Sequence, residues 1–300
     1  MTTRLRSALL LLLAALIWGS AFVGQIIGMD SVGPLTFTAA RFALGALVVA
    51  PLAWREWRQL ASAGHAPGGD GARQIVVLGL LLAAGAVMQQ VGLVTTSATN
   101  GGFLTVLYVP LVPLLAWRLL RQPPHWSVWP ASLGCVAGSW LLTGAGTPRF
   151  SAGDAWVLAS ALPWAVHVLL VGRFANRIRG AFVLACGQFA VCAAASAVAA
   201  LATETITATG LAAAAGAIVY TGVLSVGVAF TLQVVAQRHA HPADATIVLS
   251  AETVFAALFG ALLLGERIDA AGVAGCALIL CGILLVQVLP LWRHRHTAVA

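Results

Sequence analysis

Charged residues are scarce in this chain of 300 residues. Asp, Glu, Lys and Arg together make up 8% of it, against roughly 25% in ordinary soluble domains. Lysine is absent, so all 16 basic residues are arginine. Because hydrophobic residues reach 60%, the composition excludes a soluble globular domain and indicates a polytopic membrane protein.

Motifs that mark enzymes and nucleotide-driven pumps are also missing. The sequence has no HExxH, GxSxG, P-loop or Asp-rich metal motif, and its loops are too short for a catalytic domain. The net charge of +7 does not indicate a nucleic-acid partner, because no basic stripe is interleaved with aromatic residues. We therefore expect no enzyme activity, no cofactor and no metal, and any driving force must come from a gradient.

Cysteine is rare and poorly placed for a disulfide framework or a metal site. The chain has 5 cysteines, an odd number, all within apolar runs and none in a CxxC motif. Cysteines in such positions typically serve as small side chains in the packing between helices. They are Cys135, Cys186, Cys192, Cys276 and Cys281.

Ten long apolar runs dominate what is present. At 1.5 Å rise per residue, about 20 residues cross a hydrocarbon core of roughly 30 Å. The first run follows Arg4 and Arg6 but is too long for the apolar region of a signal peptide, so we count it as a span. The sequence thus predicts an all-α integral membrane fold with ten transmembrane helices, at 7–26, 34–52, 74–93, 98–117, 127–144, 154–172, 180–201, 211–232, 243–264 and 270–289. A polar loop is expected at 53–73.

The arginines indicate the orientation of these spans. Thirteen fall at the end of the bundle that holds both termini, and only Arg149 and Arg267 fall in loops at the other end. Cytoplasmic loops are enriched in arginine and lysine. We therefore predict a multi-pass membrane protein with both termini in the cytoplasm.

An internal repeat appears at a shift of about 145 residues. It divides the chain into a first half at 1–146 and a second half at 147–300, with five spans in each. Because five is odd, the halves have opposite topologies, and inverted repeats place their binding site near the bilayer midplane. The matched positions are Trp18 with Trp164, Arg41 with Gln188, and the stretch 89–102 with 233–246.

Two residues that are ordinarily charged at neutral pH lie well inside spans, where a charge costs at least about 3 kcal/mol. Glu252 lies near the middle of its span and is predicted to bind a substrate amine or a proton. The alternative is a structural carboxylate held by the hydroxyl of Ser250, Thr253 or Tyr220, or paired with Arg41. Arg41, seven residues into its span, is predicted to bind a substrate carboxylate, or else to lock its helix in an ion pair or to reach the outer surface.

Aromatic and polar side chains inside the spans complete the predicted substrate site. Trp18 and Trp164 occupy matched places in the two halves, and His167 lies one turn beyond Trp164. We interpret these three as cavity walls, able to stack on a ring or to contact an ammonium group. Packing alone is the alternative for each. The further polar candidates are Gln90, Tyr108, Gln188 and Tyr220.

Short motifs at matched places in both halves carry a family resemblance. They are 18–22, Pro34 and 40–42 in the first half, and 251–257, 264–267, Gly275 and Gly282 in the second. On these residues the chain resembles the ten-helix drug/metabolite transporters of the EamA type, over nearly its whole length, which implies a ten-helix carrier. Within the family it looks most like bacterial exporters of aromatic and other neutral amino acids, and this likeness implies a location in the bacterial cytoplasmic (inner) membrane. Thr253 stands where the family usually has a proline after the acid.

These observations favour a secondary carrier that exports neutral, preferably aromatic, amino acids by alternating access. Its partners are then a small-molecule substrate and the lipid bilayer, with the oligomeric state open. One alternative is the same scaffold with another small metabolite or a cationic drug as cargo. An integral-membrane lipid enzyme is a third reading, supported only by Asp30, Glu266 and Asp269 outside the spans.

Overall fold

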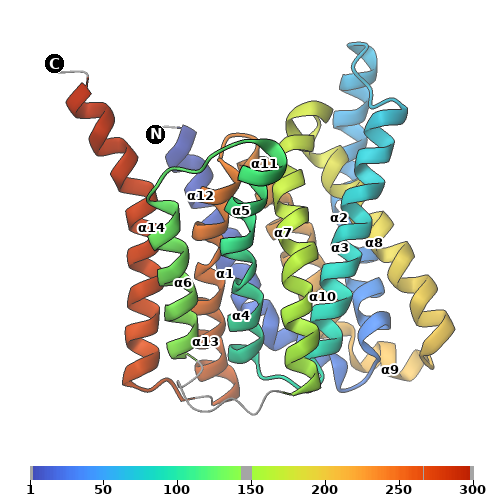
Figure 1. Ribbon diagram of the computed structural model, residues 1–300. Coiled ribbons are helices and arrows are strands. Elements are labelled where there is room, and N and C mark those ends of the chain that lie inside the picture. The colour runs from blue at the N-terminus through green and yellow to red at the C-terminus, as the bar shows by residue number, and fades with distance from the viewer. Residues whose placement is uncertain (1–2, 143–150, 266, 298–300) are drawn as a thin grey trace.

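The computed structural model describes residues 3–142, 151–265 and 267–297, and every regular element in these ranges is a helix. The helices lie side by side in one bundle, with the start of α1 and the end of α14 at the same end (Figure 1). In chain order they are α1 (Thr3–Met29), α2 (Pro34–Ser62), α3 (Gly69–Leu93), α4 (Ala98–Val106), α5 (Tyr108–Leu120), α6 (Val128–Leu142), α7 (Ala152–Ile178), α8 (Ala181–Thr203), α9 (Ala208–Ala213), α10 (Ala215–Tyr220), the π-helix η1 (Thr221–Phe230), α11 (Thr231–Gln237), α12 (Pro242–Leu249), α13 (Ala251–Leu264) and α14 (Ala270–Thr297).

The predicted membrane fold is confirmed. Within the described ranges, nine helical segments are long and apolar enough to cross a bilayer, and α6 adds an apolar helix of 15 residues. The segment α4–α5 makes one crossing, α10–η1–α11 a second and α12–α13 a third. The predicted end of the fifth span at 144, the boundary between the halves at 146, Arg149 and Glu266 lie outside the described residues.

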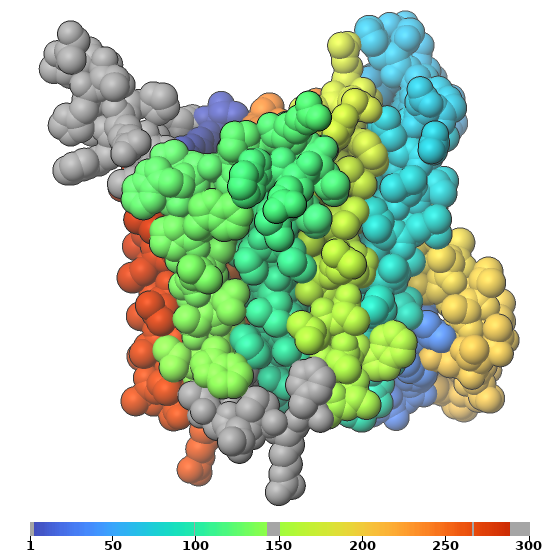
Figure 2. Space-filling model, viewed as in Figure 1, coloured from blue at the N-terminus to red at the C-terminus, as the bar shows by residue number. Residues whose placement is uncertain are grey.

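The predicted polar loop at 53–73 is mostly helical, which corrects the sequence interpretation. Helix α2 continues to Ser62 and α3 already begins at Gly69. The stretch at 54–60 is rich in Arg, Glu, Gln and Leu, which favour helix even where they are polar. These helix ends stand clear of α5 and α6 (Figures 1 and 2).

The two halves interlock instead of forming separate bodies. Helix α2 packs along α8, α3 along α7, α1 along α13 and α6 along α14, and each of these pairs joins the two halves. Glycine allows α6 and α14 to approach closely. A Cβ on Gly275 would lie only 2.2 Å from the carbonyl oxygen of Gly138, so any larger residue there would push the two helices apart. Small residues at such crossings give van der Waals contact between helices in lipid.

Helices α2 and α8 cap each other's amino termini. The Glu204 carboxylate, just after α8, accepts hydrogen bonds from the backbone N–H groups of Leu35 and Thr36 at 2.8 Å each. In return Glu56, near the end of α2, accepts from the backbone N–H groups of Ala181 at 3.1 Å and Val183 at 2.9 Å. A negative charge at a helix amino terminus satisfies free N–H groups and the helix dipole. Glycine precedes both helices at the N-cap, so the partner helix supplies the acid that the local sequence lacks.

Three spans are interrupted near half depth. Leu107 separates α4 from α5 and Ser250 separates α12 from α13, although no proline follows Glu252. The span of α10 and α11 contains a ten-residue π-helix, η1. Irregular backbone inside a membrane is tolerated where it lines a protein cavity, and π-helical turns often occur at functional sites. Pro163, by contrast, lies inside the continuous helix α7.

We predict that Glu56→Gln and Glu204→Gln each lower the free energy of unfolding by about 1 to 2 kcal/mol, because an amide presents N–H groups to the helix amino terminus in place of an oxygen. The control is Asp30→Asn, an exposed acid in the α1–α2 turn. Denaturation of the purified protein in detergent micelles measures the effect. If both variants unfold like Asp30→Asn, the caps contribute nothing to stability.

Candidate functional site: a chamber at half depth

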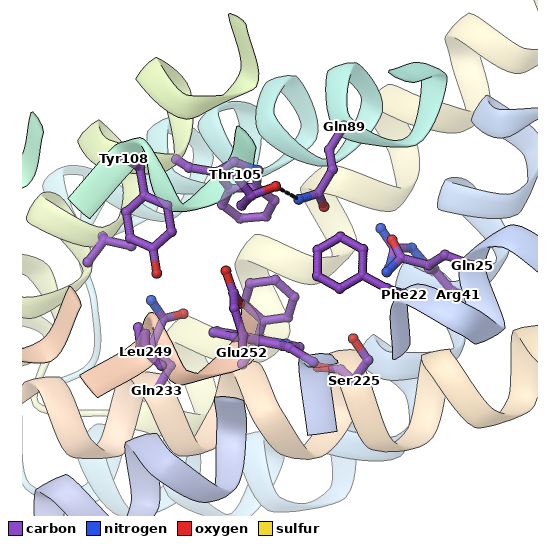
Figure 3. A pocket seen from close by; sticks show the side chains of 14 residues that line it. Phe22, Gln25, Arg41, Gln89, Thr105, Tyr108, Ser225, Gln233, Leu249 and Glu252 are labelled. Atoms are coloured by element: carbon purple, nitrogen blue, oxygen red, sulfur yellow. Dashed lines mark hydrogen bonds between the residues drawn. The ribbon is translucent and has the colours of Figure 1, made fainter. Parts of the chain in front are cut away.

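A chamber with about 530 Å³ of empty space lies inside the bundle. Its walls come from both halves, and side chains of α5, α6 and α7 close the face seen in Figure 2. Figure 3 shows it from close by. The lining residues are Trp18, Phe22, Gln25, Arg41, Gln89, Thr105, Tyr108, Trp164, Val168, Ser225, Phe230, Gln233, Leu249 and Glu252.

One wall is aromatic and brings the two predicted tryptophans together across Phe230. The Phe230 ring centroid lies 4.6 Å from that of Trp18 and 5.9 Å from that of Trp164, with the second pair stacked at 16°. The Trp18 indole N–H donates to the carbonyl of Ser225 at 3.2 Å, while Nε1 of Trp164 has no partner in the described part of the chain. This wall is therefore mostly apolar, with one free donor.

Glu252 projects into the chamber and makes no hydrogen bond or ion pair with a residue that the structure describes. Its residue is 5% exposed, and Oε1 is buried without a hydrogen bond to any described residue. In the view of Figure 3 the Tyr108 hydroxyl and the Gln233 amide lie on one side of its carboxylate, and the Phe22 ring lies on the other. A buried carboxylate that is not paired is costly, so it requires water, a proton or a ligand.

The hydroxyls that were expected to hold Glu252 are engaged elsewhere. Ser250 donates to the carbonyl of Ile247 at 2.6 Å, Thr253 to that of Gly102 at 3.4 Å, and Tyr220 shares a hydrogen bond with Ser20. Among the described residues the only ion pair is Arg4–Asp244 at 3.4 Å, so Glu252 is not paired with Arg41. The structural alternative to a binding role therefore has no contact to support it.

Arg41 faces the chamber from α2 and is 3% exposed. Its Cζ lies 5.0 Å from the ring centroid of Phe42 and 5.9 Å from that of Phe37, and Nε is buried with no hydrogen-bond partner in the described chain. The Phe22 ring lies between Arg41 and Glu252 in the view of Figure 3. Two ionisable groups of opposite sign thus face one chamber without an ion pair between them.

The internal repeat recurs in the chamber wall. Gln233 is 1% exposed and both of its polar side-chain atoms lack partners within the described ranges, whereas its counterpart Gln89 donates to Thr105 at 2.8 Å. The wall is therefore built from equivalent positions of two inverted halves, which need not carry the same residue. The counterparts that both line the chamber are Trp18 with Trp164, Phe22 with Val168, Gln89 with Gln233, Thr105 with Leu249 and Tyr108 with Glu252.

His167 and Gln188 lie behind the aromatic wall and do not line the chamber. Both are fully buried, and Nε2 of His167 lies 2.8 Å from Oε1 of Gln188. The imidazole also meets the edges of the Trp164 and Phe230 rings, at centroid distances of 5.9 and 6.4 Å. The pair therefore fixes the position of the wall from behind.

Gln90 and Tyr220 also lie outside the lining. Gln90 donates to the backbone carbonyl of Gln25 at 3.4 Å, so it supports a lining residue, and Tyr220 is half-buried beside Ser20. Five of the nine residues predicted for the site do line the chamber: Trp18, Arg41, Tyr108, Trp164 and Glu252.

Sequence reasoning missed Phe230 and gave Gln233 no role in the site. Their signal was their spacing, because residues three apart share a helix face and Gln233 is the repeat counterpart of Gln89. Phe22 could also have been identified from the sequence, because it lies one helical turn after Trp18. Within the described residues, no group of three His, Cys, Asp or Glu could hold a metal ion.

A helical bundle with spans of bilayer length around a polar chamber at half depth defines a membrane transporter. The chain belongs to the EamA-like transporter family, whose model matches residues 5–144 and 151–288. It is 30% identical over 287 residues to a protein described as an uncharacterized transporter from Archaeoglobus fulgidus, covering 95% of this chain and 86% of that one. A solved crystal structure with 22% identity superposes with a TM-score of 0.74 over 95% of this chain and 98% of the other, which shows the fold.

We predict that Gly19→Ala disturbs the chamber, because the added Cβ would lie 2.4 Å from Cβ of Phe255 and 2.8 Å from the carbonyl oxygen of Glu252. Helix α13 must then move away from α1, at a cost of about 1 to 3 kcal/mol. Gly134→Ala is the control, since its nearest neighbour would be 3.8 Å away. Thermal unfolding in micelles compares them; equal midpoints would show that the close approach at Gly19 is not required.

Proposed function

We propose that this transporter carries neutral, preferably aromatic, amino acids by alternating access. The observation that carries the proposal is that Glu252 and Arg41, ionisable groups of opposite sign, line one chamber with an aromatic wall and form no ion pair with each other. A zwitterionic amino acid supplies an ammonium group for the carboxylate and a carboxylate for the guanidinium, which can bind it through two parallel hydrogen bonds. The side chain of the amino acid then packs against Trp18, Trp164 and Phe230.

We further propose that the direction is export across a bacterial inner membrane. Arg118 and Arg177 lie in the last turns of α5 and α7, which end where α1 begins (Figure 1). Arginine-rich ends face the cytoplasm, which supports cytoplasmic termini. Three polar lining residues lie toward the end of the bundle away from the termini: Gln25 near the end of α1, Arg41 near the start of α2 and Gln89 near the end of α3. The polar part of the chamber therefore extends toward the external side.

A cationic drug is the competing cargo, since Glu252 and the aromatic wall suit an organic cation. Arg41 favours the zwitterion over the cation, because a cation without a carboxylate leaves the guanidinium unpaired and adds a like charge to the chamber. Phosphate cargoes fit poorly, because Arg41 is the only cationic side chain that lines the chamber within the described chain.

The cargo is tested by uptake of labelled phenylalanine into proteoliposomes, with competition by three analogues. We expect unlabelled phenylalanine to compete best and threonine more weakly. Phenethylamine, which lacks the carboxylate, and 3-phenylpropionate, which lacks the amine, should each compete at least tenfold less well than phenylalanine. Uptake no faster than in empty vesicles contradicts the amino-acid proposal, and strong competition by phenethylamine alone favours the cationic cargo.

We predict that Glu252→Gln lowers kcat/KM for phenylalanine at least tenfold, since the amide loses the charge that faces the ammonium group. Arg41→Gln should weaken phenylalanine binding and remove the preference for phenylalanine over phenethylamine. Glutamine already occupies the counterpart position, Gln188, so the second half of the repeat tolerates this residue. The control is Asp70→Asn, an exposed acid in the first turn of α3. If Arg41→Gln keeps the wild-type preference for phenylalanine over phenethylamine, Arg41 does not bind the substrate carboxylate.

A further inference from the structure

A second hollow opens at the end of the bundle that holds both termini. It has about 1030 Å³ of empty space and lies between the end of α5, the last turns of α7 and the turn from α11 to α12. We call it the terminal basin. Its lining includes Gln122, Arg173, Asn176, Gln237, Arg238 and His241.

The terminal basin is basic. It contains Arg173 and Arg238 and no acidic residue among its described lining. Neither arginine is in an ion pair within the described chain, and Nε of Arg238 is buried without a hydrogen-bond partner there. The acid of the adjoining hollow, Asp244, already pairs with Arg4. The basin therefore offers unneutralised guanidinium groups to a carboxylate.

Only one helical turn separates the terminal basin from the chamber. On α7, Val168 lines the chamber while Leu169 lines the basin; on α11, Gln233 lines the chamber while Gln237, one turn later, lines the basin. We call this one-turn layer between α7 and α11 the seal. A hydrogen bond joins its two sides, since the Gln237 amide donates to the carbonyl of Val168 at 3.1 Å. Gln237 is 1% exposed, and its Oε1 has no partner in the described chain.

We propose that the terminal basin is a second binding station for the substrate, which holds its carboxylate at Arg173 and Arg238 before passage through the seal between α7 and α11. The inference rests on the proposed function, because a carboxylate-bearing cargo is what matches the charge of the basin. Parting of α7 from α11 breaks the Gln237–Val168 hydrogen bond and joins the basin to the chamber. Gln237 then presents an amide to the passing ammonium and carboxylate groups.

The binding station is tested with Arg173→Gln and Arg238→Gln, against Arg177→Gln as the matched control on α7. Arg177 is exposed and lies outside the basin lining. Phenylalanine uptake is measured in vesicles whose outer face carries the termini, with orientation determined by protease cleavage. We expect KM to rise about threefold to tenfold for the two basin variants, with kcat little changed, and to stay at the wild-type value for Arg177→Gln. Unchanged KM in both basin variants overturns the binding station.

The seal is tested with a disulfide between Gly172→Cys and Gln237→Cys. A Cβ built on Gly172 lies 3.9 Å from Cβ of Gln237, within the separation of about 3.5 to 4.5 Å that a disulfide needs. The other cysteines are replaced, and each single variant is the control under the same oxidant. We expect at least a tenfold loss of uptake in the oxidised pair and recovery after reduction. Full uptake by the oxidised pair shows that the passage lies elsewhere.

Failure of the two proposals is distinguishable. If wild-type vesicles take up no amino acid, the proposed function and the inference fall together. If wild-type uptake is normal while the basin variants and the oxidised pair behave like their controls, only the inference falls.

Discussion

A carboxylate inside a hydrocarbon-spanning helix must have a polar or wet environment, and the interior of this protein is arranged around that requirement at Glu252. Packing alone would seal the middle of the bundle with apolar side chains. Instead two spans are interrupted at Leu107 and Ser250, and a third is wound as a π-helix, so that irregular backbone and polar side chains gather at one depth. The chamber is the consequence, and it stays polar without an internal ion pair to fill it.

The inverted repeat determines where the chamber lies, while differences between the halves determine its charge. Trp18 and Trp164 are the same residue at equivalent places, and together with Phe230 they make the aromatic wall. Where Glu252 stands in the second half, Tyr108 stands in the first. The residues that the two halves share thus determine the shape of the chamber. The difference at Tyr108 and Glu252 places an acid in the wall contributed by the second half only.

Composition, run length and the odd number of spans per half were enough to predict the fold, because each follows from the cost of exposing backbone and charge to lipid. Glu252 and Arg41 could be placed because a charged group inside a span must face inward, and Trp18 because it has the same residue, Trp164, at the matched place in the other half. His167 and Gln188 could not, since a hydrogen bond between them removes both from the chamber, and spacing along one helix does not reveal a partner on another. The extension of α2 was missed for another reason: the polar stretch at 54–60 was interpreted as a loop although its residues favour helix. What the sequence could not reveal is the contact of Glu56 with α8, far away in sequence.

The exchange of caps between α2 and α8 also bears on how the protein is made. Glu204, the acid that caps α2, is synthesised 168 residues after Thr36, one of the groups it caps. While the ribosome is still producing the first five spans, the amino terminus of α2 has only water and lipid headgroups to satisfy its N–H groups. The nascent first half therefore cannot reach its final arrangement until α8 has entered the bilayer, so the two halves mature together although they are translated one after the other.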